Sequence, residues 1–214
     1  PHDAYFSTLN ELLKAEGPGR PVMLLDRTRM NHNIDVLARS VGPEKTYRVV
    51  VKSLPSVELL RHVMDRAKTQ ALMVFHQPFL NRIAESFPES DVLLGKPMPV
   101  QAARTFYERF HHGPSASGAK PFAPEHQLQW LIDTPDRLGE YQALARALGV
   151  HMRINVEIDV GLHRGGIEDP EALGRMLTII SEDPAHLGFT GLMGYEPHLT
   201  GMAADLDHPA VKAV

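Results

Sequence analysis

The sequence of 214 residues contains no cysteine, which excludes disulfide bonds, thiolate catalysis and zinc sites built on cysteine. It also lacks any apolar run near the roughly 20 residues that a bilayer span requires, and its first residues show no secretory pattern. The formal net charge is only −4, which gives no electrostatic reason to expect nucleic acid or an anionic membrane as a partner. These absences suit a protein of the cytoplasm, where we expect it to reside.

Apolar residues make up 43% of the chain and charged residues 22%, the composition of a globular protein with enough apolar material for a core. Short apolar runs predict buried strands, and apolar residues three and four positions apart predict helices. The predicted strands cover residues 21–26, 47–52, 71–76, 91–96, 128–133, 152–159 and 188–196. The predicted helices cover residues 4–16, 27–40, 56–67, 78–87, 99–110, 135–148 and 170–182. Residues 111–126, rich in Gly, Pro, Ser and Ala, predict a surface loop.

Strands and helices alternate from residue 47 onward in about six units, which predicts a parallel α/β fold. A doubly wound sheet and a (β/α)8 TIM barrel both match this order. No G-x-G-x-x-G follows a strand, so the dinucleotide-binding form of the doubly wound sheet lacks its main signature. Polar residues gather where the predicted strands end, and in a barrel all of these ends meet at one mouth. They are Lys52, His76, Lys96, Asp133, Asp159, Tyr195 and Glu196.

We therefore favour the barrel. The chain then divides into an N-terminal helical segment (residues 1–20), an opening strand and helix (21–46) and an incomplete TIM barrel (47–214). Because a closed barrel of this class has eight strands, we expect two further strands beyond Val214.

Lys52 ends the strand-like run Tyr47–Val51, and Leu54-Pro55 then stops it. A run of valines without polar alternation is typical of a parallel strand that is covered on both faces. A lysine is costly in that setting because its ammonium loses water. Lys52 either marks the point where the strand reaches the surface, or it opens the barrel mouth, where a desolvated amine is a nucleophile toward aldehydes.

The segment Val156–Gly166 joins two acidic residues, an arginine and three glycines at the end of a predicted strand. Glycines allow tight folding and close approach to a ligand, and Arg164 offers a planar fork for a carboxylate, phosphate or phenolate oxygen. The alternative is an ordinary turn with an Asp159–Arg164 ion pair. Glu157 and Asp159 lie two residues apart on one side of the strand. In a barrel this would place both inside, where carboxylates need a cation.

A second polar strand end, Gly191–His198, contains Tyr195 and His198. These side chains offer acid–base groups or a ring that packs against a flat cofactor, although a half-buried tyrosine and a loop histidine occur in many proteins. None of the 12 histidines forms an H-E-x-x-H or comparable pattern. We therefore nominate no metal ligand.

Three parts of the sequence together resemble the pyridoxal-phosphate enzymes of fold type III, the alanine racemase-type barrel, and within it the D-threonine aldolase and D-serine dehydratase branch. They are the opening segment from Pro21 to Ile34, the strand end Val51-Lys52-Ser53, and the pair Glu157–Gly166 and Gly194–His198. The resemblance covers about residues 20 to 200. The chain departs from the branch in residues that surround the substrate, namely Val50, Ser53-Leu54-Pro55, Lys96 and Pro197.

The resemblance implies that Lys52 holds pyridoxal 5'-phosphate as a Schiff base and then acts as an acid–base group. It implies that Arg164 bonds the cofactor's phenolic oxygen or the substrate carboxylate. Tyr195 and His198 are then expected to border the cofactor ring as catalytic and cofactor-binding residues. Weaker candidates for the substrate side are His76, Lys96 and Asp133.

The activity that the resemblance implies is elimination or retro-aldol cleavage of a D-amino acid, by a lyase or deaminase of the D-serine dehydratase or D-threonine aldolase type. The alternatives are an amino-acid racemase of the same fold, a non-catalytic carrier that regulates the supply of pyridoxal phosphate, and an unrelated barrel enzyme with a structural Lys52. The resemblance also implies a homodimer. Beyond Val214 it implies a C-terminal β-domain, the strands that hold the cofactor phosphate, and residues that bind a divalent metal.

Overall fold

The structure is a computed structural model that describes residues 3–110, 121–200 and 209–212. The chain divides into two compact units, Pro1–Ser40 and Val41–Val214. Most of the predicted surface loop lies outside the described residues. Among the helices that the structure describes, none combines the length and the apolar character needed to cross a bilayer.

The first unit consists of two helices joined by an extended segment. Helix α1 spans Ala4–Glu16 and begins at Asp3, whose carboxylate accepts a hydrogen bond from the Phe6 amide at 3.1 Å. Helix α2 spans Arg27–Ser40. Both helices have the predicted bounds.

The strand predicted over residues 21–26 is absent, so this prediction is wrong. The apolar side chains of the segment are exposed, from 45% for Val22 to 90% for Met23. A strand needs a neighbour for its backbone hydrogen bonds and a surface for its apolar face, and no described strand pairs with this segment. An apolar run was therefore not sufficient to form a strand here.

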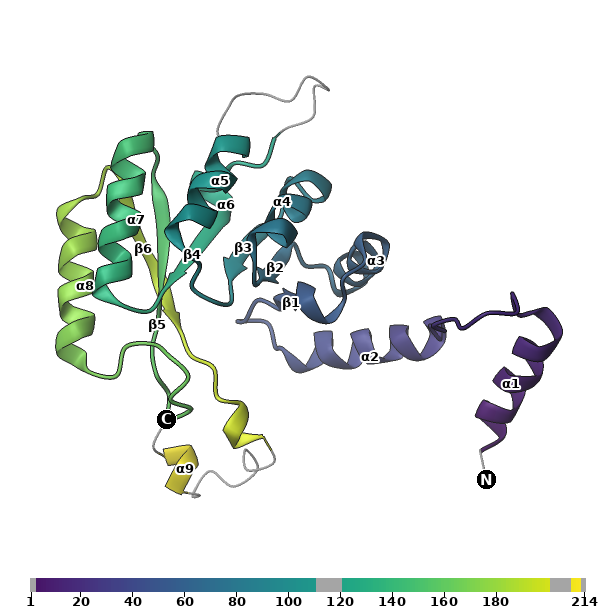
Figure 1. The fold of residues 1–214 in the computed structure, drawn as a ribbon. Helices are drawn as coiled ribbons and strands as arrows, with labels where there is room; N and C mark the ends of the chain where they lie inside the picture. The colour runs from purple at the N-terminus through teal and green to yellow at the C-terminus, as the bar shows by residue number, and fades with distance from the viewer. Residues whose placement is uncertain (1–2, 111–120, 201–208, 213–214) are drawn as a thin grey trace. The chain divides into compact units, whose positions relative to one another are not determined.

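The second unit is built on six parallel strands whose order in the sheet follows the sequence (Figure 1). The strands are β1 (Val49–Val50), β2 (Ala71–Val74), β3 (Asp91–Leu94), β4 (Leu128–Ile132), β5 (Met152–Glu157) and β6 (Leu187–Met193). A doubly wound sheet reverses its order at a switch point, whereas a (β/α)8 barrel keeps the order of the sequence. The strands therefore form part of a barrel, which does not close within the described residues.

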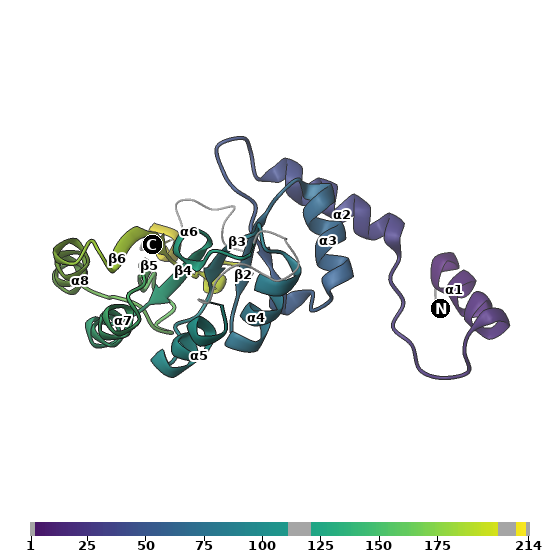
Figure 2. The same ribbon diagram turned by 90° about the horizontal axis from the view of Figure 1, so that it is seen from above.

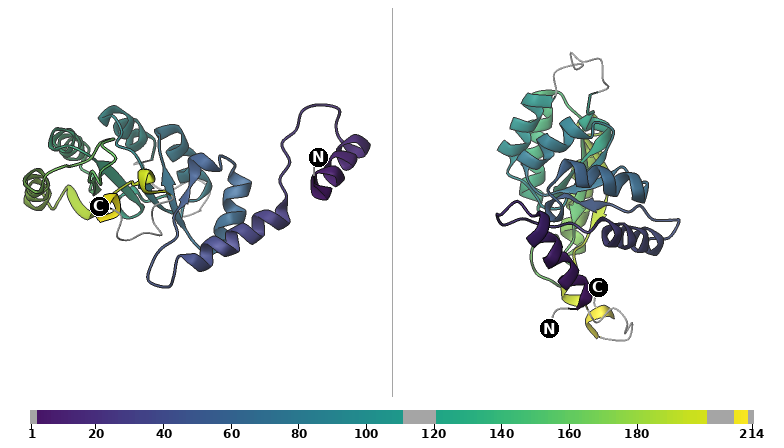
Figure 3. Two further views of the ribbon diagram at one scale, coloured as in Figure 1. Left: turned by 90° about the horizontal axis from the view of Figure 1, so that it is seen from below. Right: turned by 90° about the vertical axis from the view of Figure 1, so that its right-hand side faces the viewer.

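Helices fill the connections between the strands. They are α3 (Val57–Ala67), α4 (Gln77–Ser86), α5 (Val100–Phe110), α6 (Pro124–Gln127), α7 (Pro135–Leu148) and α8 (Pro170–Glu182), with α9 (Pro209–Lys212) after the last strand. Figure 2 and Figure 3 show α4, α5, α7 and α8 following one side of the sheet. The side chains of Ser56, Thr134 and Asp169 cap α3, α7 and α8 at their first turns.

The core lies between the sheet and these helices. Trp130 on β4 is buried, and its ring packs on those of Phe106, Tyr107 and Tyr141, with centroids 5.5 to 6.0 Å apart. Its Nε1 donates a hydrogen bond to the Tyr107 hydroxyl at 3.0 Å, which satisfies a buried donor. Burial raises the pKa of the Tyr107 phenol, which therefore stays neutral.

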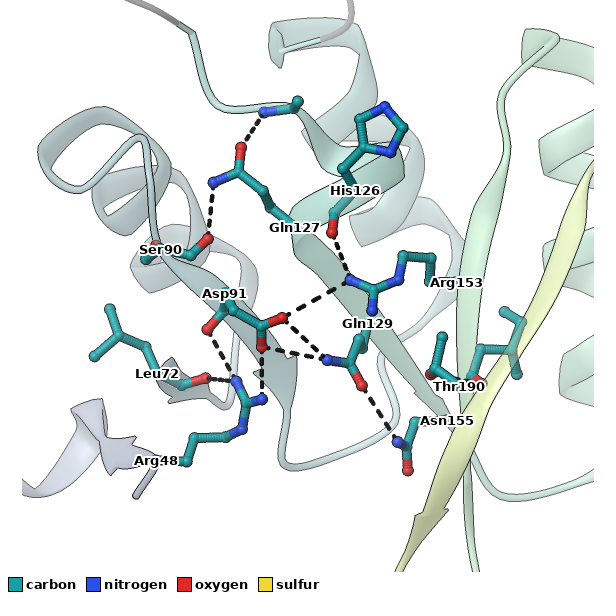
Figure 4. A network of polar contacts seen from close by, with 12 residues as sticks. Arg48, Leu72, Ser90, Asp91, His126, Gln127, Gln129, Arg153, Asn155 and Thr190 are labelled. Carbon is teal, nitrogen blue, oxygen red and sulfur yellow. Dashed lines mark hydrogen bonds and ion pairs between the residues drawn. The ribbon is translucent and has the colours of Figure 1, made fainter. Parts of the chain in front are cut away.

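A polar network joins the strands near their N-terminal ends (Figure 4). Arg48 pairs with the Asp91 carboxylate at 2.5 Å and also donates to backbone carbonyls of β2 and β3. Gln129 donates to the same carboxylate at 3.2 Å, and Asn155 donates to Gln129 at 3.4 Å. Charged and amide groups need such partners when they are withdrawn from water. The network therefore links β2, β3, β4 and β5 at one end of the sheet and leaves the other end for the site.

Each strand of this unit ends earlier than predicted. β1 pairs with only two residues of β2, and the chain then turns into the short 3-10 helix η1 (Val51–Ser53). β5 ends at Glu157 rather than Asp159, and β6 ends at Met193 rather than Glu196. The polar residues predicted at the strand ends therefore lie in the loops just beyond them.

Candidate active site

A pocket of about 330 Å³ lies at the C-terminal ends of the strands in the second unit. Its lining residues are Val50, Lys52, Ser53, Met73, Phe75, Gly95, Arg164, Met193 and Tyr195. Three of the predicted site residues, Lys52, Arg164 and Tyr195, therefore come together although they lie far apart in the sequence.

Lys52 lies on η1, directly after β1. A hydrogen bond from the Leu54 amide to the Val51 carbonyl closes this turn at 3.0 Å, and the following Pro55 cannot donate to a strand ladder. The Lys52 side chain is exposed, and its Nζ lies 3.8 Å from the centroid of the Phe75 ring. The expectation of a desolvated amine is wrong for this structure, because the Lys52 side chain is exposed.

Arg164 is held from two sides. Its Nη2 donates to Glu157 Oε1 at 2.9 Å, and its Cζ lies 4.2 Å from the centroid of the Tyr195 ring. Glu157 is only 2% exposed, and its Oε2 has no hydrogen-bond partner among the described residues. A buried carboxylate needs a cation nearby, and Arg164 supplies it. The guanidinium is thereby fixed at the pocket, with its remaining donors left for a ligand.

Asp159 does not form the alternative ion pair with Arg164. Its Oδ1 accepts hydrogen bonds from the backbone amides of Gly161 and His163 at 2.9 and 3.0 Å, and its Oδ2 lies 2.9 Å from His163 Nδ1. The His163 amide, with these other bonds, lowers the pKa of the Asp159 carboxyl. Asp159, His163 and Glu168 have possible metal-ligand atoms within 4.8 Å of one another. Because both Asp159 oxygens already hold the loop, we assign no metal to this group.

Gly166 allows this loop to fold back onto the end of β5. Its φ is +106°, in the left-handed region that favours glycine, and a Cβ there would lie 2.7 Å from the Asp159 nitrogen. The next residue, Ile167, donates to the Glu157 carbonyl at 2.8 Å and accepts from the Asp159 amide at 2.9 Å. Glycine at position 166 therefore fixes the loop that presents Arg164 to the pocket.

The three weaker candidates for the substrate side do not line this pocket. His76 immediately precedes α4 and packs edge-on against Phe79, with ring centroids 4.3 Å apart. Asp133 pairs with Arg137 at 3.2 Å, and Lys96 is half-buried. All three follow strand ends, as predicted, but the described structure does not bring them to Lys52.

His198 also lies outside the pocket lining. It belongs to the 3-10 helix η2 (Pro197–Leu199), and its Nε2 is 3.4 Å from the position that a Cβ on Gly161 would take. Its Nδ1 is buried and has no hydrogen-bond partner in the part of the chain that the structure describes. The imidazole therefore packs on the same loop that carries Arg164, with one ring nitrogen unsatisfied.

Sequence reasoning missed the apolar part of the pocket, which is formed by Met73, Phe75, Gly95 and Met193. Residues two positions apart on a strand face the same side, so Met73 and Phe75 share a side that His76 does not. Polarity alone favours His76 over its neighbour Phe75. The alternation along β2 was the signal that identifies Phe75.

Residues 25–212 match a family model, that of the alanine racemase N-terminal domain. The chain belongs to this family. The predicted fold, an alanine racemase-type TIM barrel present in part, is confirmed by this match and by the six parallel strands. Comparison with curated protein sequences gave no match.

Three solved structures illustrate the likeness in fold. Alanine racemase from Oenococcus oeni matches with a TM-score of 0.63 and 13% identity, over 86% of this chain and 47% of that one. D-threonine aldolase from Filomicrobium marinum matches with a TM-score of 0.63 and 15% identity, over 80% of this chain and 43% of that one. Histidine racemase from Leuconostoc mesenteroides subsp. sake matches with a TM-score of 0.60 and 13% identity, over 78% of this chain and 41% of that one. The chain thus spans less than half the length of these three proteins. At such low sequence identities the likeness concerns the fold alone.

Proposed function

We propose that this protein binds pyridoxal 5'-phosphate through Lys52 and acts on a D-amino acid as a lyase or deaminase, of the D-serine dehydratase or D-threonine aldolase type. The observation that carries the proposal is the convergence of Lys52, Arg164 and Tyr195 on one pocket. The family resemblance supports the cofactor, and the likeness in fold to a D-threonine aldolase supports a lyase.

The pocket suits the chemistry of pyridoxal phosphate, which is a flat, anionic aromatic aldehyde. Lys52 provides a primary amine for the aldehyde, and Arg164 provides a cation for the phenolic oxygen or for a carboxylate. Met73, Phe75 and Met193 provide apolar surface for a ring. The volume of about 330 Å³ lies at the lower end of the range for small-molecule sites, roughly 300–1,000 Å³.

Charge also favours an anionic ligand. The described lining contains two cationic side chains, Lys52 and Arg164, and no acidic one. The Glu157 carboxylate offsets the charge of Arg164 but accepts a hydrogen bond only from Nη2, so the other guanidinium donors can still bind an anion. A guanidinium with free donors beside a primary amine attracts carboxylates and phenolates, which are the groups that a cofactor of this kind and an amino acid carry.

Each of these residues has a task within the proposal. Lys52 Nζ is the nucleophile that holds the aldehyde, and in its free form it carries a proton as the acid–base group. Arg164 orients the phenolic oxygen or the substrate carboxylate, the Tyr195 ring borders the cofactor ring, and His198 relays protons or packs beside them. When bound, pyridoxal phosphate supplies an electron sink for the negative charge that develops at the α-carbon. The substrate-side roles of His76, Lys96 and Asp133 stay predictions.

A racemase is the second candidate, because the likeness in fold includes an alanine racemase and a histidine racemase. A carrier of pyridoxal phosphate without turnover remains the alternative outside enzymes. By the same family resemblance we propose a cytoplasmic homodimer and, for a lyase, the use of a divalent metal.

Product analysis separates these candidates. The protein is incubated with pyridoxal phosphate and D-serine, D-threonine or D-alanine, and the products are resolved by chiral chromatography. A lyase yields pyruvate from D-serine or glycine and acetaldehyde from D-threonine, whereas a racemase yields the L-amino acid and a carrier yields nothing. Lys52→Arg is the matched control, since it keeps the charge and removes the nucleophilic amine. Turnover at the unaltered rate in Lys52→Arg would contradict the proposed role of this lysine.

A further inference from the structure

The Lys52 amine lies on the face of an aromatic ring. Its Nζ is 3.8 Å from the centroid of Phe75, well within the distance of about 6 Å over which a cation is attracted by a ring face. Phe75 is half-buried, directly follows β2, and lines the same pocket as Lys52. No hydrogen bond or ion pair reaches Lys52 Nζ from the residues that the structure describes. The ring is therefore the contact that locates this amine.

Gly95 gives the Phe75 ring its place. A Cβ at position 95 would lie 2.5 Å from Cζ and 2.6 Å from Cε1 of Phe75, and 2.8 Å from Sδ of Met73. Carbon atoms do not approach so closely, so any larger residue would push the ring away. The Gly95 amide also donates to the Val74 carbonyl at 2.8 Å, which extends the pairing of β2 with β3. The backbone at Gly95 is therefore held in position, and a side chain there would displace the ring instead.

We propose that Phe75 is a positioning residue for Lys52: its ring face holds the amine at the pocket wall, and glycine at position 95 allows the ring to lie there. A lysine side chain is long and flexible, so an exposed amine without a contact samples many positions. A carboxylate would also hold it, but with strong hydrogen bonds to the amine. A ring face attracts the cation without such bonds and leaves the amine available for a carbonyl carbon. The catalytic meaning of this contact rests on the proposed function, whereas the contact itself does not.

Competitive labelling of lysines tests the contact without any cofactor. The protein is treated with a limiting amount of acetic anhydride, and peptide mass mapping gives the labelling of Lys52 relative to the exposed Lys68 in the same sample. The ring covers one side of the amine, so the reagent can approach it from fewer directions. We expect Phe75→Leu and Gly95→Ala each to raise the ratio about two- to fivefold, the range of an exposed cation–ring contact.

Two matched variants serve as controls. Phe79→Leu makes the same change at a ring that packs on His76 and does not line the Lys52 pocket. Gly139→Ala adds a methyl group on α7, where a Cβ meets nothing within 4 Å. Both should leave the ratio unchanged. Gly95→Ala changes neither Lys52 nor Phe75, so it still tests the contact if Phe75→Leu fails to fold. Likewise, Phe75→Leu still tests the contact if Gly95→Ala fails to fold.

An unchanged ratio in the folded variants, or an equal rise in the two controls, would overturn the proposal. A second measurement separates it from the proposed function: trapping of added pyridoxal phosphate on Lys52 by borohydride, followed as a rate. We expect this rate to fall in Phe75→Leu and Gly95→Ala while acetylation rises, because a displaced amine is more accessible but less well placed. If the unaltered protein traps no pyridoxal phosphate while the acetylation ratio still rises in both variants, the contact stands and the proposed function fails.

Discussion

The two partners of the Glu157–Arg164 ion pair behind the pocket differ in burial, so we expect their removal to cost different free energies of unfolding. The Glu157 side chain is 2% exposed, whereas the Arg164 side chain is 28% exposed. Removal of the arginine leaves a charged carboxylate in the interior without its partner, which costs about 3–5 kcal/mol in comparable cases. Removal of the carboxylate leaves a guanidinium that still reaches water. It also removes the negative charge shared by Glu157 Oε2, which finds no hydrogen-bond partner among the described residues.

We therefore expect Arg164→Gln to lower the free energy of unfolding by about 3–5 kcal/mol. Glu157→Gln should lower it by only about 1 kcal/mol, the difference between a charged and a neutral hydrogen bond. The double variant should be less destabilised than Arg164→Gln alone, since no buried charge is left unpaired. The exposed Arg175–Glu171 pair at 3.1 Å provides the control, and Arg175→Gln should cost at most about 1 kcal/mol.

Urea unfolding followed by circular dichroism gives these free energies, provided that the dependence on urea has the same slope in each variant. Two results would refute the reasoning. One is a loss in Glu157→Gln as large as that in Arg164→Gln. The other is a double variant less stable than Arg164→Gln, which would mean that the buried charge was not the source of the cost.

Three further outcomes follow from the site and its loop. Gly166→Ala should lower the free energy of unfolding by about 1–3 kcal/mol, because alanine is strained at this positive φ and its Cβ would contact backbone atoms. If urea unfolding showed equal stability, the loop would not depend on this glycine. The pKa of Asp159 is lowered, first by the His163 amide, so its stabilising effect is complete above the ordinary value of about 3.9 and is lost as the pH falls through the folded value. The stability difference between the protein and Asp159→Asn should thus shrink below about pH 4, and a difference that grows there would contradict this. Tyr195→Leu removes the ring beside the site arginine and should weaken pyridoxal phosphate binding about two- to fivefold in an absorbance titration, with Tyr195→Phe unaffected.

The helices and the order of the strands were predictable because they depend on local patterns. Apolar spacing gave α1, α2 and α8 with the bounds that the structure has. Strand ends were not predictable in this way, because a strand extends only as far as a neighbour pairs with it. β1 is two residues long for that reason, and the apolar segment 21–26 forms no strand.

The rule that parallel strand ends converge brought out Lys52 and Tyr195, and the glycine-rich segment after a strand brought out Arg164; one pocket contains all three. It did not say toward which side each residue points. His76 and Phe75 are adjacent, and the aromatic residue lines the pocket while the polar one packs on its own helix. These contacts depend on the loops, and a strand-end rule contains no information about them.

The partner of Arg164 was a similar case. The ion pair expected from the sequence was that of Asp159 with Arg164, although Glu157 lies on the same side of the predicted strand. The strand ends at Glu157, and backbone amides of the following loop take up Asp159, which leaves Glu157 for the arginine. The hydrogen bonds of the loop therefore determine which of the two acidic residues pairs with Arg164.

Borohydride reduction of the protein in the presence of pyridoxal phosphate, followed by peptide mass mapping, tests most directly whether Lys52 holds this cofactor. We predict a phosphopyridoxyl group on the peptide that contains Lys52, and none on the corresponding peptide of Lys52→Arg. An adduct confined to other lysines, or no adduct with the cofactor in excess, would contradict the assignment of the pocket to pyridoxal phosphate.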